Sequence, residues 1–414
     1  MAEVLRAFKF ALDPTPSQLS MLKRCAGAAR FAFNFALAMK KEAHQQWRDQ
    51  VTELVASGVE EKEARSRIKV RFPKKPEVYK AFQRLRGDAR KGIDGIAPWH
   101  VELPTWCFQS AWVDADRAWQ NWLDSLRGKR SGRTVGYPRF KTKHRSRDSF
   151  RLHHDTKHPS LRLEGYRRLK LGKLGSFRLH DSGKRMHRLI ASNKAVVQSV
   201  TVSRGGSRWY ASVLCKVKMD LPEPTRRQRD NGRVGVDLGV NHLAALSVPV
   251  DGADLVENPR YLRKATQKLK KAQQALSRTQ KGSARRRKAA ERVGRIHHAV
   301  AQQRATFLHL LTKRLATTFS CVAIEDLSVA GMTVSARGTV NKPGKNVKAK
   351  AGLNRSILDT APAELRRQLE YKTFWYGSQL AVLDRWFPSP GLTFWYLLIR
   401  HWQGHSGTDL PRQR

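Results

Sequence analysis

Acidic residues are scarce in this chain of 414 residues, which has 34 Asp and Glu against 80 Lys and Arg. The formal net charge is +46 at pH 7, and the isoelectric point is near 11.0. Such an excess of one sign repels itself in a compact fold unless a polyanion neutralises it, and the usual polyanion is nucleic acid. A solvated basic surface without a partner is the less favoured alternative. We therefore predict a nucleic-acid-binding protein.

Cysteine is also rare. The four cysteines are Cys25, Cys107, Cys215 and Cys321, and they form no C-x-x-C pair. Their wide separation argues against a disulfide framework and against a zinc site. They are interpreted as small buried apolar residues of a protein in a reducing compartment.

Long apolar runs are missing. No stretch reaches the roughly 18 apolar residues of a membrane span. The N-terminal A-F-K-F-A-L of residues 7–12 alternates instead of forming the uninterrupted core of a signal peptide. We expect a soluble cytoplasmic protein without a membrane partner, and the sequence predicts no oligomeric state.

The length is typical of two or three domains. Residues 7–12 predict a short strand, after which Thr15 as N-cap and Pro16 at the first helical position predict a helix start. A helical pattern then extends to about residue 125. Prolines are expected to break it at Pro73, Pro76, Pro98 and Pro104.

Tryptophans recur at helical spacing within residues 106–123. Trp112 and Trp119 are seven positions apart, and Trp122 follows three later. Such a stripe is more often core packing than a platform for stacking bases, so core is the preferred interpretation.

A basic loop follows at residues 125–147. It combines turn residues, dense cations and two aromatic rings, so it cannot pack a core but can follow a phosphate backbone and offer a ring to a base. The candidate nucleic-acid-binding residues here are Tyr137, Arg139, Phe140, Lys141 and Lys143.

Strand patterns occupy residues 149 to about 217 and, with the first strand, predict a small β-barrel or sheet domain. A polar segment at 220–233 is the expected domain boundary. Further on, residues 260–318 predict a long basic helical pair. Its joint supplies the candidate nucleic-acid-binding residues Arg285, Arg286 and Arg287.

Three segments complete the readable pattern. Residues 335–352 predict a mobile basic loop, residues 361–372 a helix, and residues 379–387 a strand.

Two carboxylates stand in apolar strand patterns of the second domain. Asp237 lies within V-G-V-D-L-G-V, and Glu325 ends F-S-C-V-A-I-E. Acids that end neighbouring strands of one sheet can share Mg²⁺, and a metal pair can hydrolyse a phosphodiester. The residues alone leave a structural acid satisfied by backbone donors equally open. Asp326 is an alternative to Glu325, because successive strand residues face opposite ways.

Several motifs resemble the OrfB/TnpB family, transposon-encoded relatives of type V CRISPR effectors. These are G-V-D-L-G-V-N-H-L-A, V-A-I-E-D-L-S-V-A-G-M, E-L-R-R-Q-L-E-Y-K, D-R-W-F-P-S, F-K-F-A-L-D-P-T-P-S-Q and G-Y-P-R-F-K-T-K. The resemblance runs from about residue 5 to 389. It implies an RNA-guided DNA endonuclease, nucleoid-associated in a prokaryote, with guide RNA and target DNA as partners. It also implies that Asp237 and Glu325 are catalytic residues and the first two ligands of a three-carboxylate Mg²⁺ site.

The implied fold class is α+β multidomain. A wedge β-barrel is expected at 1–12 and 149–219, with a helical recognition region inserted at 13–148. After the linker at 220–233, a RuvC-like nuclease domain of the RNase H fold is expected at 234–390, interrupted by the pair at 260–318.

The sequence departs from the family pattern in its last residues. Where the family continues into a zinc ribbon with two C-x-x-C pairs and a third acid, residues 391–414 form an aberrant tail with neither. Neither Asp384 nor Asp409 has a geometric reason to replace the third acid. We expect an inactive or impaired nuclease without zinc ligands, and both a frameshift and a true truncation stay open as causes.

Overall fold

The computed structural model describes residues 2–130, 134–143, 145–155 and 159–383. The chain forms two compact units: Glu3–Met219 is one, and the described residues from Asp220 onward, with Ala2, belong to the other. Each unit has its own hydrophobic core. Each is described by itself below.

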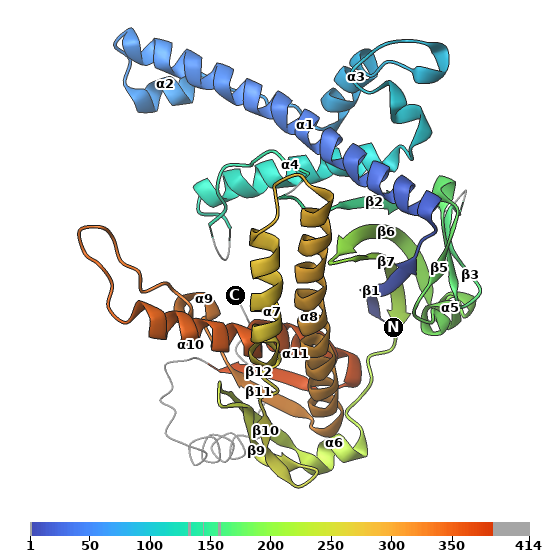
Figure 1. The fold of residues 1–414 in the computed structure, drawn as a ribbon, viewed down its shortest axis with the longest axis vertical. Helices are drawn as coiled ribbons and strands as arrows, with labels where there is room; N and C mark the ends of the chain where they lie inside the picture. The colour runs from blue at the N-terminus through green and yellow to red at the C-terminus, as the bar shows by residue number, and fades with distance from the viewer. Residues whose placement is uncertain (1, 131–133, 144, 156–158, 384–414) are drawn as a thin grey trace. The chain divides into compact units, whose positions relative to one another are not determined.

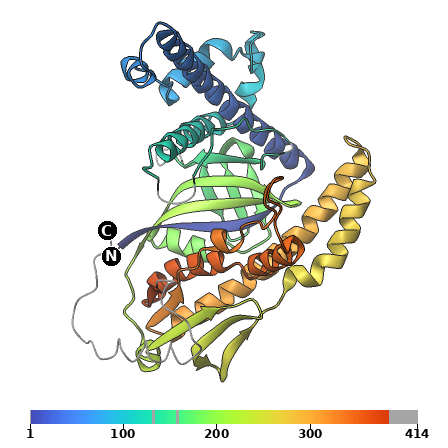
Figure 2. The same cartoon turned by 90° about the vertical axis from the view of Figure 1, so that its left-hand side faces the viewer.

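The first unit contains a curled sheet of seven strands (Figures 1 and 2). Its hydrogen-bonded order is β2-β6-β7-β1-β5-β4-β3, with β2 and β3 at the two edges of the described sheet, so it is a half-barrel rather than a closed barrel. The strands are β1 (Ala2–Asp13), β2 (Ser149–His153), β3 (Leu161–Glu164), β4 (Arg168–Leu171), β5 (Ser176–Leu179), β6 (Ala195–Gly205) and β7 (Arg208–Met219). The helix α5 (Lys184–Ala191) lies between β5 and β6 in the chain.

Helices occupy the segment between β1 and β2. They are α1 (Pro16–Ala56), α2 (Glu61–Arg67), α3 (Lys75–Leu85) and α4 (Trp106–Leu126), with short 3₁₀ turns at Ala89–Lys91 and Pro98–Glu102. The predicted start of α1 is confirmed, since Thr15 Oγ1 accepts a hydrogen bond from the backbone N–H of Gln18 at 3.3 Å and Pro16 is the first helical residue. Pro76 lies in the first turn of α3, where its missing N–H costs nothing, and does not break a helix.

The tryptophan stripe of α4 faces the core. Trp112, Trp119 and Trp122 are 1%, 3% and 8% exposed, which confirms the preferred interpretation. The helix α4 packs against α1, whose buried residues include the small Ala28, Ala32 and Ala36.

The second unit is built on a sheet of five strands in the order β10-β9-β8-β11-β12. Its strands are β8 (Arg233–Leu238), β9 (His242–Val250), β10 (Ala253–Glu257), β11 (Cys321–Glu325) and β12 (Gln379–Leu383). The pairs β10·β9 and β9·β8 are antiparallel, whereas β8·β11 and β11·β12 are parallel. A parallel pair needs a long crossover, and most of the chain between β10 and β11 is helical.

The helices of the second unit are α6 (Arg226–Asn231), α7 (Tyr261–Ser277), α8 (Ala284–Thr318), α9 (Val329–Met332), α10 (Val347–Thr360) and α11 (Pro362–Tyr376). The helices α7 and α8 are the predicted basic pair and pack side by side (Figures 1 and 2). Leu308 and Leu315 of α8 join Val234 and Ile324 of the sheet in one core. In the part of the chain that the structure describes, no helix is long and apolar enough to cross a membrane.

The predicted loop at 335–352 is partly wrong. Its last six residues are the start of α10, because V-K-A-K-A-G is rich in Ala and Lys, which favour helix. The breakers Gly338, Pro343 and Gly344 lie before the helix, and an isolated bridge joins Gly338 to Pro343. The predicted strand at 379–387 is found as β12 up to Leu383, and its remainder lies outside the described residues.

The four cysteines are free thiols. Cys25, Cys107 and Cys215 are buried and Cys321 is partly buried. The prediction of small buried apolar residues is confirmed for Cys25, Cys107 and Cys215, which belong to the core of the first unit, but not for Cys321.

A buried lysine joins α8 to α11. The ammonium of Lys372 donates to the carbonyl of His309 and to Thr312 Oγ1, both at 2.7 Å, and it is also near Gln368 Oε1 at 3.3 Å. Burial is the main cause that lowers its pKa to about 8, with a smaller effect from the charge of Lys313, while Glu364 opposes the shift.

The free energy of unfolding is expected to depend on this lysine above pH 8. An unfolded lysine has a pKa of about 10.4, so between pH 8 and 10.4 the unfolded chain binds more protons and stability rises with pH. Below pH 8 the cost of the buried charge is fully present. Thermal unfolding at pH 7.5 and 9.5 should show the wild type gaining stability relative to Lys372→Met as pH rises. A difference between the two proteins that does not change with pH would contradict this role.

A glycine at the end of α11 permits a close approach of two chain segments. Gly377 has a φ of +72°, and a Cβ there would lie 2.3 Å from the carbonyl oxygen of Pro222. We expect Gly377→Ala to destabilise the second unit by at least about 2 kcal/mol. Gly352 in α10 has no atom within 4 Å of the same position, so Gly352→Ala should be neutral or stabilising by up to about 1 kcal/mol. Urea denaturation measures both, and equal midpoints for the two variants would contradict the close contact.

Candidate active site and nucleic-acid interface

Asp237 and Glu325 lie at the same edge of the second sheet. The strands β8 and β11 are adjacent and parallel, and Val236 is opposite Ile324, so Asp237 and Glu325 follow in step. Adjacent strands are about 4.8 Å apart, which places the two acids side by side. Val236 and Ile324 are fully buried, whereas the acids are partly exposed. The prediction that these acids end neighbouring strands is confirmed.

The two carboxylates repel each other. The pKa of Glu325 is raised above its usual value, first by burial and second by the negative charge of Asp237. Within the described ranges, neither side chain accepts a hydrogen bond from the backbone or forms an ion pair with a cation. The arrangement therefore favours a cation between the acids over acids held by backbone donors.

Asp326 belongs to a different environment. Its carboxylate pairs with Arg366 of α11, and its backbone N–H donates to the carbonyl of Leu383 at 2.8 Å. Since neighbouring strand residues face opposite ways, Glu325 is the acid that accompanies Asp237.

The donor set fits a hard divalent cation. Mg²⁺ prefers carboxylate oxygens and commonly keeps several waters, so two acids with open solvent access are a suitable partial site. The described residues contain no group of three or more metal-ligating side chains. Asp384 and Asp409 lie outside the described residues, so the expected loss of the third ligand and of the zinc ligands stays a prediction.

The turn after β8 is fixed by Gly239, which the sequence indicates as a turn residue, and by Asn258, which sequence reasoning missed. Gly239 is required by a close approach, because a Cβ there would be 2.9 Å from the carbonyl oxygen of His242. Asn258 Nδ2 donates to the carbonyl of Val240 at 2.7 Å, and Asn258 Oδ1 accepts from the backbone N–H of Arg260. These contacts hold the turn that follows Asp237, and no spacing in the sequence points to them.

The basic loop contributes two rings and two open cations. Tyr137 and Phe140 are 39% and 48% exposed, and the Lys41 ammonium lies 4.8 Å and 4.6 Å from their ring centroids. Arg139 and Lys143 are exposed. Tyr137 is partly committed to the fold, since its ring packs edge-on against Trp122 at 4.8 Å.

Lys141 anchors this loop. Its backbone N–H donates to Asn34 Oδ1 at 2.8 Å, and Asn34 Nδ2 donates back to its carbonyl at 2.9 Å. The ammonium lies 3.8 Å from the Phe33 ring centroid, and burial lowers its pKa. Lys141 therefore positions the exposed residues of the loop more than it offers a free charge.

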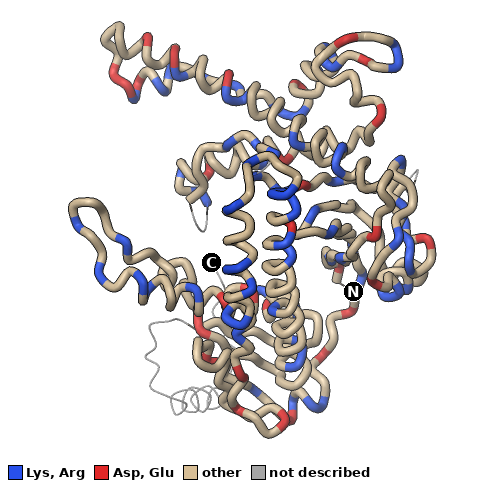
Figure 3. Tube along the Cα trace, viewed as in Figure 1, with Lys and Arg blue, Asp and Glu red and all other residues tan. Residues whose placement is uncertain are grey.

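Of the three arginines in the joint between α7 and α8, one forms hydrogen bonds within the protein and two are exposed. Arg286 Nη1 donates to the carbonyls of Leu276 and Thr279 at 3.1 Å and 2.9 Å, which closes the turn between α7 and α8. Arg285 and Arg287 are exposed. Figure 3 shows Lys and Arg distributed along both helices, as expected of a surface that follows a phosphate backbone.

Comparisons with known proteins identify the family. The family model described as "Probable transposase" matches residues 216–336, and the one described as "Helix-turn-helix domain" matches residues 1–49. A Mycobacterium tuberculosis protein named "Putative RNA-guided DNA endonuclease" is 36% identical over 388 residues, covering 93% of this chain and 77% of the relative. An Escherichia coli K12 protein, "Putative RNA-guided DNA endonuclease InsQ", is 33% identical over 382 residues, with 92% and 80% covered. The chain belongs to the OrfB/TnpB family.

One solved structure, titled "Cryo-EM structure of the Cas12f1-sgRNA-target DNA complex", aligns with a TM-score of 0.41 and 9% sequence identity. The alignment covers 92% of this chain and 89% of that chain.

The matched N-terminal residues do not form a helix-turn-helix here. Residues 2–49 contain β1 and most of α1, which continues without a break from Pro16 to Ala56. The first helix packs instead against α4, which lies far along the sequence.

Substitutions in the helical joint should separate structure from binding. Arg286→Ala is expected to loosen the turn, because two carbonyls lose their donor at a cost of about 1–3 kcal/mol. Faster amide hydrogen exchange at the ends of α7 and α8 would report this. Arg285→Ala and Arg287→Ala should leave exchange unchanged and lower the salt dependence of RNA binding. Equal exchange in all three variants would contradict the assignment of Arg286.

Proposed function

We propose that this chain is an RNA-guided DNA endonuclease of the TnpB type, with guide RNA and target DNA as partners. The main support is the side-by-side placement of Asp237 and Glu325 at the ends of β8 and β11, on a chain with a net charge of +46. The names of relatives that match more than nine-tenths of the chain point to the same activity. We expect it to act in the cytoplasm of a prokaryote, where DNA is accessible.

The domain roles follow from the two units. The five-stranded sheet, with three antiparallel strands followed by two parallel ones, has the strand order expected of an RNase H-like nuclease domain. We assign residues 234–390 to this RuvC-like domain and 220–233 to the linker before it. The curled sheet is assigned as the wedge, and the segment 13–148 as the recognition region.

Asp237 and Glu325 are assigned as the catalytic carboxylates. Bound Mg²⁺ would supply an activated water and stabilise the leaving oxygen of a phosphodiester. The chain's own contribution is to hold both acids at one sheet edge. The backbone-fixed turn at Gly239–Asn241 positions the residues that follow Asp237, and pairing with Arg366 keeps Asp326 away from the other two acids.

Impaired cleavage is the second part of the proposal. The described residues supply two clustered carboxylates, and the family pattern has three. Two ligands hold and orient a cation less firmly than three, so we expect weak cation binding and slow cleavage. A nuclease-dead RNA-guided DNA-binding protein is the corresponding second candidate, because the basic surfaces do not depend on the metal.

The test uses the full chain purified with its RNA, and DNA that matches that RNA. Asp237→Asn and Glu325→Gln should each lower Mg²⁺-dependent cleavage by about 100-fold or more, corresponding to about 2.7 kcal/mol, while RNA and DNA binding change little. Asp326→Asn is the matched control and should retain activity.

The remaining outcomes identify the alternatives. Sequence-directed DNA binding without cleavage by the wild type indicates the nuclease-dead candidate. Binding that is sequence-blind, strongly salt-dependent and unaffected by Asp237→Asn indicates a structural RNA-binding protein and contradicts the proposal.

A further inference from the structure

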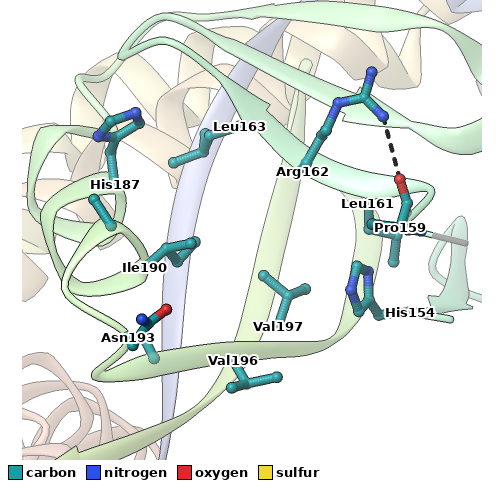
Figure 4. Close-up of a pocket in the computed structure, with 12 residues that line it drawn as sticks. His154, Pro159, Leu161, Arg162, Leu163, His187, Ile190, Asn193, Val196 and Val197 are labelled. Atoms are coloured by element: carbon teal, nitrogen blue, oxygen red, sulfur yellow. Dashed lines mark hydrogen bonds between the residues drawn. The ribbon is translucent and has the colours of Figure 1, made fainter. Parts of the chain in front are cut away.

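A pocket in the first unit is lined by none of the candidate site residues that the sequence predicts. It has a volume of about 320 Å³ and is bounded by β3, α5 and the start of β6, together with the residue that follows β2 (Figure 4). Binding pockets for small molecules typically measure about 300–1,000 Å³. This one can therefore hold a single ring system but not a nucleic-acid duplex.

The floor of the pocket is apolar. Leu161 and Val197, 2% and 7% exposed, belong to the core of the unit, and Leu163 and Ile190 pack against that core. A floor of this kind favours a flat, poorly hydrated surface such as the face of a base.

Two imidazole rings line the walls. His154 follows β2 and His187 lies on α5, and in Figure 4 they lie on opposite sides of the pocket. The His187 ring is braced edge-on by Tyr166 at 5.0 Å, and His154 is held by its backbone N–H, which donates to the carbonyl of Gln198. Burial lowers the pKa of His154, which favours the neutral form of its ring. Histidine rings are among the side chains on which unpaired bases stack.

Asn193 supplies a polar side chain, and its backbone is held in place. Its backbone has a φ of +54°, and its N–H donates to the carbonyl of Ile190. The turn after α5 therefore fixes the backbone position from which the carboxamide extends. An Asn carboxamide pairs with the N6 and N7 edge of adenine through one donor and one acceptor.

Cations lie on the elements that bound the pocket. Arg162 lines the pocket, and its guanidinium donates to the carbonyl of Pro159 at 3.2 Å, the bond drawn in Figure 4. The exposed cations of α5 and the following turn are Lys184, Arg185, Arg188 and Lys194. They can contact the phosphates that flank a base inserted into the pocket.

From this combination we propose that the pocket binds one unpaired adenine of the RNA held by this protein. The inference rests on the proposed function, because it names which part of a bound RNA the curled sheet recognises. The base stacks between His154 and His187, the Asn193 carboxamide reads its edge, and the cations bind the flanking phosphates.

The test compares two 12-mer RNAs, one of uridine alone and one with a single central adenosine, and needs neither target DNA nor Mg²⁺. The wild type should bind the adenosine 12-mer about tenfold more tightly, since the Asn193 carboxamide selects the edge of adenine, whereas stacking serves every base. Asn193→Gly suits the positive φ and removes only the carboxamide, so it should abolish the preference and leave the salt dependence unchanged. Asn346→Gly, at another residue with a φ of +54°, is the matched control and should keep the preference.

A second pair of variants guards against misfolding. Ala191→Phe fills the pocket and should also abolish the preference, whereas Ser192→Phe places the same ring at the neighbouring exposed position, which does not line the pocket, and should not. Ultraviolet cross-linking should join the adenosine to the peptide that contains His187 and Asn193.

Three results would overturn the inference. They are equal wild-type affinity for both 12-mers, a preference that survives Asn193→Gly, and competition by AMP as strong as that by the 12-mer itself. Because this binding assay contains no cleavage step, loss of the proposed nuclease activity and failure of the pocket are distinguished.

Discussion

The parallel pairing of β8 with β11 is the constraint on which the second unit depends. It brings two strands that are distant in the sequence into register, so that Asp237 and Glu325 end at one edge. A parallel pair cannot be closed by a short turn, and the helices α7 and α8 lie in the connection that completes it. The same pairing is electrostatically unfavourable, because it holds two negative charges close together. Burial and the charge of Asp237 together raise the pKa of Glu325.

Acidic residues are scarce in this chain, and several of them hold elements of the fold together. Asp359 accepts a hydrogen bond from the backbone N–H of Leu262 at 3.0 Å and pairs with Arg304 at 2.5 Å, which ties α10 to the starts of α7 and the middle of α8. In the first unit, Asp148, the residue after the basic loop, pairs with Arg30 of α1 at 2.6 Å. By contrast, neither Asp237 nor Glu325 forms an ion pair with a cationic side chain of the described residues.

Many of the basic and aromatic residues serve the fold before they can serve a ligand. Lys141, Arg286 and Lys372 each donate to carbonyl oxygens or contact rings within the protein. Their exposed neighbours, such as Arg139 and Arg287, keep their charges toward solvent. A binding surface of this kind combines anchored residues, which fix the position of a segment, with free cations that can follow a phosphate backbone.

The sequence by itself determined the features that depend on local pattern and composition. These include the start of α1 at Thr15, the buried stripe of Trp112 and Trp119, the basic helical pair, and the placement of Asp237 and Glu325 at strand ends. Each follows from periodicity, a cap or charge, which act over a few residues. Only the tertiary structure decided which acid faces Asp237, which arginine closes the helical joint, that the first sheet is open, and that His154, His187 and Asn193 line one pocket. Those outcomes depend on contacts between residues far apart in the chain. Packing and strand register set the geometry of these contacts, and the local spacing of residues does not predict it.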